Sequence, residues 1–134
     1  MSDYLASIND VFVVHGSYKQ YNSNSYLSWK AEVSWSNIFA LISPYLLQPQ
    51  NDAGVSLTLA KVLFEKYKGG GTSPSINDQT FQTIKIQLMA LNLVEVKSLN
   101  TTKGFPALFW CLTKNGREVM MSIRTIKAPK QDKQ

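Results

Sequence analysis

Apolar residues in the C-terminal half of the chain change their spacing from helical to extended. Over residues 78–91 they recur at three- and four-residue steps, which places them on one face of a helix: Phe81, Ile84, Leu88 and Leu91. Asn92 tolerates a left-handed C-terminal cap, so the helix is expected to end there. Leu93, Val94 and Val96 then favour a short strand.

The pattern after this strand predicts a second strand and a last helix. A turn-prone stretch from Ser98 to Pro106 separates the first strand from the apolar run Ala107 to Leu112. Thr113 can cap a helix through its hydroxyl. The apolar face of that helix would consist of Val119, Met120 and Ile123.

The N-terminal part of the chain predicts a β-hairpin. Val11 to Val14 is a short β-branched and aromatic run. From Tyr26 to Trp35, apolar and polar residues alternate with the period of a half-buried strand. The segment 16–25 between them is rich in Gly, Ser and Asn, so we expect a long loop there that carries tyrosines near its tip.

Two further helices are expected in the middle of the chain. Ser34 or Ser36 can cap the first, and Pro44 requires that it starts late, kinks or ends near Ser43. After a polar linker over residues 48–54, a second helix is expected to stop at Gly69. Residues 69–75 are predicted to be a flexible turn. This helix and the helix over 78–91 would then form a helix-turn-helix pair with a long turn.

Helix, short strand, loop, strand and helix in this order resemble the recognition helix and wing of winged-helix domains. The run Trp-Cys-Leu-Thr-Lys-Asn-Gly-Arg-Glu (residues 110–118) is similar to the junction between wing and last helix in many bacterial winged-helix regulators. The resemblance implies an α+β winged helix with an added N-terminal hairpin over residues 10–35. It would form one domain over residues 1–126, followed by a basic, disordered tail over residues 127–134.

A narrower resemblance covers residues 10–126. The runs 33–47 and 78–94 look like a C-terminal domain of unknown function that follows TIR-like or nucleotide-processing domains in bacterial proteins. In such proteins the chemistry would belong to the N-terminal domain, which implies a non-catalytic role for this region. The chain would then be a fragment of a larger protein or a stand-alone relative.

Composition narrows the classes of protein. The 134 residues suit one domain, and the hydrophobic share of 44% argues against disordered and fibrous classes. No apolar run approaches the roughly 20 residues needed to cross a bilayer, and residues 1–10 lack a signal-peptide pattern. With Cys111 as the only cysteine no internal disulfide forms, so a cytoplasmic protein is expected. The net charge is +5, but most of it lies in residues 124–134, which supports nucleic-acid binding only mildly.

The sequence offers little material for catalysis. His15 is the single histidine, and the nine acidic residues are scattered without a helical pair. The glycine run at 69–71 lacks the Gly-Lys-Ser/Thr ending of a phosphate-binding loop. Cys111 lies in an apolar strand, where a buried, inert thiol is expected. We therefore expect no enzyme, no cofactor and no metal.

Two binding hypotheses remain. The first is a regulatory or protein-interaction domain whose partner is another protein or its own N-terminal effector domain. The second is a module that reads duplex DNA with this helix and the wing over residues 97–106. The candidate DNA contacts are Gln79, Gln82, Thr83, Lys85, Lys97 and Lys103. Only one of the helix residues is positive, which leans toward the first hypothesis.

Aromatic residues concentrate in the hairpin. Trp29 and Trp35 are expected in the core, whereas Tyr18 and Tyr21 near the loop tip are expected at a protein interface or in solvent. A hairpin at the rim of a small sheet leaves unpaired backbone groups that invite a second copy of the chain. This favours a homodimer formed through the hairpin.

Overall fold

The N-terminal hairpin is longer than its hydrophobic pattern predicts. In the computed structural model, which describes residues 6–127, strands β1 (Val11–Lys19) and β2 (Tyr26–Ser34) pair antiparallel without a break in register. The expected loop over residues 16–25 is therefore wrong for its first four residues, and residues 20–25 alone form the turn. The pairing of Gly16 with Trp29 outweighs the turn propensity of the Gly-Ser sequence, because the glycine leaves room for the indole.

A third strand joins this hairpin where a flexible turn is expected. Strand β4 (Thr72–Ile76) pairs antiparallel with β1, which gives a sheet in the order β2–β1–β4. The indole Nε1 of Trp29 donates to the carbonyl oxygens of Ser17 at 3.1 Å and Ser75 at 3.2 Å. The tryptophan therefore ties all three strands together, although the sequence of β4 is mostly polar.

Helix α1 (Trp35–Ile42) follows β2 directly, and the Ser34 hydroxyl caps it by accepting from the amide of Asn37 at 3.1 Å. Of the outcomes that Pro44 allows, the helix ends near Ser43, and a 3₁₀ turn, η2 (Ser43–Leu46), takes over. Helix α2 (Asp52–Tyr67) begins inside the expected linker, because the side chain of Asn51 caps it.

The C-terminal half agrees closely with its pattern. Helix α3 (Asp78–Ala90) is followed by Asn92 in the left-handed conformation, with φ of 59°, and then by strands β5 (Val94–Asn100) and β6 (Pro106–Leu112). These strands pair antiparallel and extend into the expected loop, so that only residues 101–105 turn. The short strand β3 (Gln50–Asn51) pairs with β6, which gives a second sheet in the order β3–β6–β5.

Helix α4 (Lys114–Arg124) closes the described chain. The Thr113 hydroxyl accepts from the amide of Gly116 at 2.8 Å, as expected for its cap. Met120 is buried and Val119 is half-buried, but Ile123 is exposed, so the apolar face is narrower than expected. Residues 128–134, most of the tail that the sequence predicts to be disordered, lie outside the described residues.

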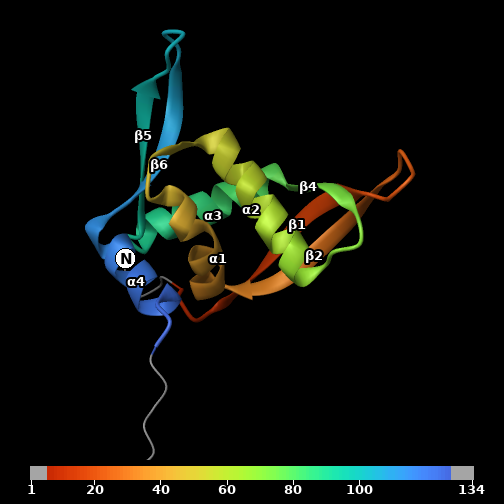
Figure 1. Ribbon diagram of the computed structural model, residues 1–134, viewed down its shortest axis with the longest axis horizontal. Coiled ribbons are helices and arrows are strands. Elements are labelled where there is room, and N and C mark those ends of the chain that lie inside the picture. The colour runs from red at the N-terminus through yellow and green to blue at the C-terminus, as the bar shows by residue number, and fades with distance from the viewer. Residues whose placement is uncertain (1–5, 128–134) are drawn as a thin grey trace, which may run out of the picture.

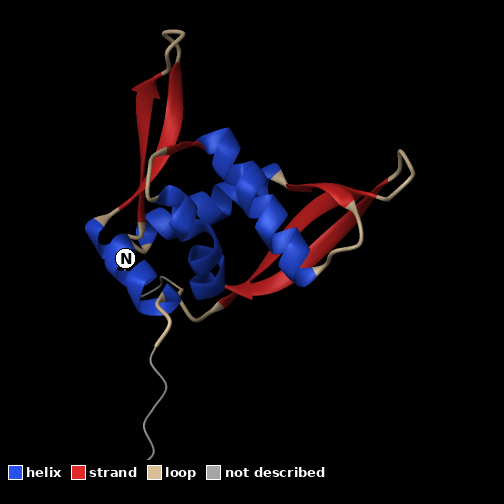
Figure 2. Cartoon of the chain, in the orientation of Figure 1, coloured by secondary structure: helices blue, strands red, loops and turns tan. Residues whose placement is uncertain are grey.

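The described residues thus form an α+β fold with four α-helices and two three-stranded sheets (Figure 2). Its core contains Trp29 and Trp35, as expected, together with Phe39, Leu63 and Trp110. Figure 1 shows that the β1–β2 and β5–β6 hairpins project from the helices in different directions. The loops at the two hairpin ends are therefore separate surfaces.

Candidate interaction surface

Helix α3 turns one face to the core and one to solvent. Phe81, Ile84 and Leu88 are buried, as the three- and four-residue spacing predicts. On the opposite side Gln79, Thr83, Ile86 and Ala90 are exposed; this set is called the α3 face below. Ile86 at its centre is 61% exposed. A shallow cleft of about 320 Å³ runs along this face, lined by glutamine, threonine and isoleucine side chains.

Lys85 does not lie on the α3 face. The residue is only 6% exposed, and its Nζ lies 3.0 Å from Asp52 Oδ1 at the start of α2. The same ammonium donates to the Oε1 of Gln82 at 3.0 Å and lies over the ring of Phe81. The expectation that Lys85 faces outward toward DNA is therefore wrong. Positions 81, 85 and 88 share one side of the helix, so Lys85 lies beside the apolar residues that α3 buries.

Gln82 is likewise less available than the sequence indicates. Its Nε2 donates to Asp78 Oδ1 at 3.2 Å, and its Oε1 accepts from Lys85. The residue is half-buried. Both ends of the amide are thus occupied, which leaves Gln79 and Thr83 as the exposed polar residues among the candidates on this helix.

Sequence reasoning missed that Asp52 is the partner of Lys85. Asp52 also binds Trp110 of the second sheet, which is fully buried and whose indole Nε1 donates to Asp52 Oδ1 at 2.8 Å. Its ring stacks on Phe81 with the centroids 5.6 Å apart. Asp52, Lys85 and Trp110 form a polar network that fastens α3 to the start of α2 and to β6. The network positions the α3 face.

The two wing lysines lie elsewhere. Lys97 on β5 and Lys103 in the 101–105 loop are exposed, and Lys97 pairs with Glu95 at 3.3 Å. Figure 1 shows the β5–β6 hairpin projecting away from the helices, with the 101–105 loop at its far end. The same hairpin exposes apolar surface at Leu99, Phe105 and Leu108.

The two tyrosines assigned to an interface are separated by burial. Tyr18 is only 6% exposed, and its ring packs against Phe64 with the centroids 5.0 Å apart. The expectation that Tyr18 is accessible is wrong, because β1 extends to Lys19 and places position 18 on the core side of the sheet. Tyr21 in the 20–25 turn is exposed.

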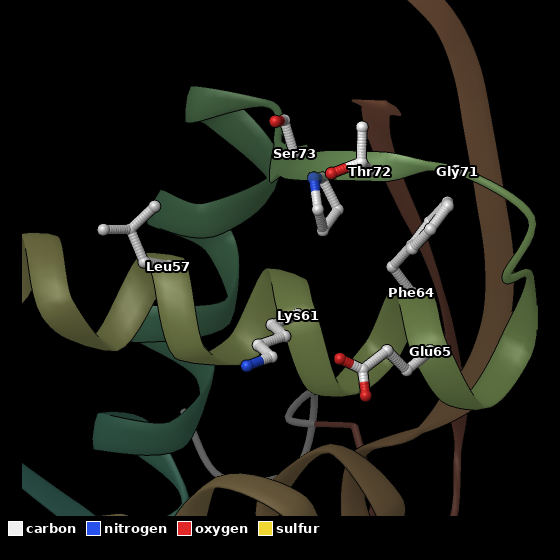
Figure 3. A pocket seen from close by; sticks show the side chains of 8 residues that line it. Leu57, Lys61, Phe64, Glu65, Gly71, Thr72 and Ser73 are labelled. Carbon is white, nitrogen blue, oxygen red and sulfur yellow. The ribbon is translucent and has the colours of Figure 1, made fainter. Parts of the chain in front are cut away.

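A second cleft, of about 350 Å³, lies between α2 and β4. Figure 3 shows Leu57, Lys61 and Glu65 on α2, with Phe64 directed toward Gly71 and the strand passing above. Two opposite charges, the hydroxyls of Thr72 and Ser73 and a few apolar groups line it.

Among residues 6–127, no three His, Cys, Asp or Glu side chains gather as they would around a metal ion. None of the helices in that range is long and apolar enough to cross a membrane. Comparison with known proteins found no protein-family model and no curated protein that matches this chain.

Proposed function

We propose that this chain is a non-catalytic recognition module of the winged-helix type. Helix α3 directly precedes the antiparallel pair β5–β6, which is the order of a recognition helix and its wing, and α4 follows. The pairing of β3 with β6 supports the assignment, because β3, which lies between α1 and α2 in the chain, holds the base of the wing. Strand β4 is an addition that replaces the simple turn between α2 and α3.

The partner is another protein or an effector domain of the same polypeptide, bound at the α3 face. The observation that carries this proposal is the absence of positive charge on that face, since Lys85 is buried against Asp52. Phosphate contacts made by lysine and arginine supply a large share of the affinity of DNA-binding proteins. An exposed isoleucine surrounded by amides and a hydroxyl instead matches the apolar core and polar rim of a protein interface.

Ile86→Asp should weaken partner binding while the fold remains intact. A carboxylate at the centre of the interface would have to be desolvated without a counter-charge, so we expect the Kd to rise at least about tenfold. A photo-cross-linking residue at position 83, in cells that produce the protein, would identify the partner by mass spectrometry. Calorimetry with the purified partner would then give both dissociation constants.

Leu57→Asp is the matched control, because Leu57 is about as exposed on a helix as Ile86 but belongs to α2 and does not line the cleft along the α3 face. It should leave the affinity unchanged. A partner that binds the Ile86→Asp variant as tightly as the parent, or that is lost only with Leu57→Asp, would overturn the assignment of the surface.

Duplex DNA should bind no more tightly than the nonspecific range of about 10⁻⁴–10⁻⁶ M at physiological salt. Fluorescence anisotropy with labelled duplexes of mixed sequence, at several salt concentrations, measures this. Tighter binding would favour the DNA-reading alternative. Lys97→Ala and Lys103→Ala would then each lower the salt slope by about 1, because each removes one phosphate contact.

A further inference from the structure

The sheet β2–β1–β4 has two outer strands, and they differ in their capacity to pair. Strand β4 contains Pro74, which has no amide hydrogen, and Ser73 in the left-handed conformation, and its register with β1 shifts. Strand β2 has nine residues without proline or glycine in unbroken register with β1. Of these two edges, β2 is the one that can accept a further strand.

The hydrogen bonds at the two ends of the hairpin identify the free backbone groups of β2. The amide of Gln20 donates to Ser25 and the amide of Trp35 donates to Asp10, each at 3.1 Å. Hydrogen-bonded pairs alternate along an antiparallel ladder, so the odd-numbered residues of β2 bond to β1. The even-numbered residues direct their free backbone groups to the open edge: Tyr26, Ser28, Lys30, Glu32 and Ser34. Ser34 offers only its N–H there, because it is the N-cap of α1 and its C=O accepts the first hydrogen bond of that helix.

Two opposite charges lie at the centre of this edge. Lys30 and Glu32 are exposed, and neither makes an ion pair within residues 6–127. When two copies of β2 pair antiparallel about a two-fold axis at Ala31, Lys30 of each copy lies opposite Glu32 of the other. Moving the register by two residues puts like charges opposite each other. Moving it by one residue places the free groups against residues whose groups are already bonded.

We propose that a second copy of this chain binds along β2 in this register and forms a continuous six-stranded sheet. Each pair of positions occurs twice about the two-fold axis, so the 30–32 pairs would supply about four backbone hydrogen bonds and the 28–34 pairs about two, since the Ser34 C=O belongs to α1. The exposed Tyr26 and Leu27 would lie beside the first turn of the partner's α1. This edge is separate from the α3 face, so dimer formation does not depend on the proposed function.

The test exchanges the charges at these two positions. Lys30→Glu alone makes both cross-strand pairs acidic, and Glu32→Lys alone makes both basic. Each variant should therefore associate with itself at least about tenfold more weakly than the parent. An equimolar mixture of the two variants should recover a heterodimer, because every pair is then opposite in charge. Sedimentation equilibrium over micromolar concentrations measures all three samples.

The double variant Lys30→Glu/Glu32→Lys should dimerise like the parent, and Lys61→Glu on α2 is the control for the change in net charge. Circular dichroism of each sample reports whether it is folded. A parent that stays monomeric would overturn the proposal, as would single variants that associate like the parent. Failure of the mixture or of the double variant to recover the dimer would overturn the register.

Discussion

Asp52→Ala should lower the free energy of unfolding by about 2–4 kcal/mol. The substitution leaves the buried ammonium of Lys85 without a counter-charge and the indole N–H of the fully buried Trp110 without an acceptor. Removing one member of a buried pair costs about 3–5 kcal/mol. The Asp52 side chain is 29% exposed, so water would solvate part of the remaining charge and reduce this figure. Loss of an acidic residue from the first turn of α2 adds to the effect.

Urea denaturation followed by circular dichroism would measure the change, with Glu65→Ala as the matched control. Glu65 is an exposed acid on the same helix, and its removal should change the stability by less than about 0.5 kcal/mol. Adding Lys85→Met to Asp52→Ala should restore part of the loss, because the unpaired charge is removed as well. Equal stabilities for Asp52→Ala and Glu65→Ala would show that the network contributes nothing.

Where the apolar period is strong, the sequence predicts the elements well. Helix α3 ends within a residue of its expected bound, and Asn92 adopts the expected left-handed conformation. The antiparallel pair β5–β6 and the Thr113 cap of α4 also agree. In these segments local propensity and tertiary packing favour the same structure, so the pattern is sufficient.

The sequence is a weaker guide where tertiary contacts decide the backbone. Residues 72–76 are polar and contain a proline, yet they form β4, because Trp29 and the pairing with β1 supply the hydrogen bonds. Strand β3 is two residues long and has no periodicity of its own. It pairs with β6, which sets Gln50 opposite Trp110, and no local pattern indicates a contact between residues so far apart in the sequence.

The candidate surface could be predicted only in part. The positions of Gln79 and Thr83 follow from helical geometry, and both are exposed. Lysine is usually solvated, so the sequence predicts that Lys85 lies on the same face. Its burial depends on Asp52, which lies 33 residues earlier on another helix, and no local pattern indicates that pairing. The spacing of Lys85 from Phe81 and Leu88 was the one available sign that it points inward.

Gly116→Ala should destabilise the protein by up to about 2 kcal/mol, although helix propensity alone predicts the opposite. Alanine is favoured over glycine inside a helix by about 1 kcal/mol. A Cβ at position 116, however, would overlap the backbone carbonyl of Leu93, so the start of α4 would have to move away from the residue that precedes β5. Such overpacking costs about 1–3 kcal/mol. That movement would also strain the bond from the Thr113 amide to the Leu93 oxygen.

Thermal and urea unfolding of Gly116→Ala would give the sign directly. Ser122→Ala is the control, because Ser122 is exposed on the same helix and its replacement should be neutral or slightly stabilising. A Gly116→Ala protein more stable than the parent would show that α4 is not held closely against Leu93. A less stable protein would show that the backbone at the start of α4 lies close against the Leu93 carbonyl. That close contact is the reason that position 116, the last of the Thr-Lys-Asn-Gly sequence, requires a glycine.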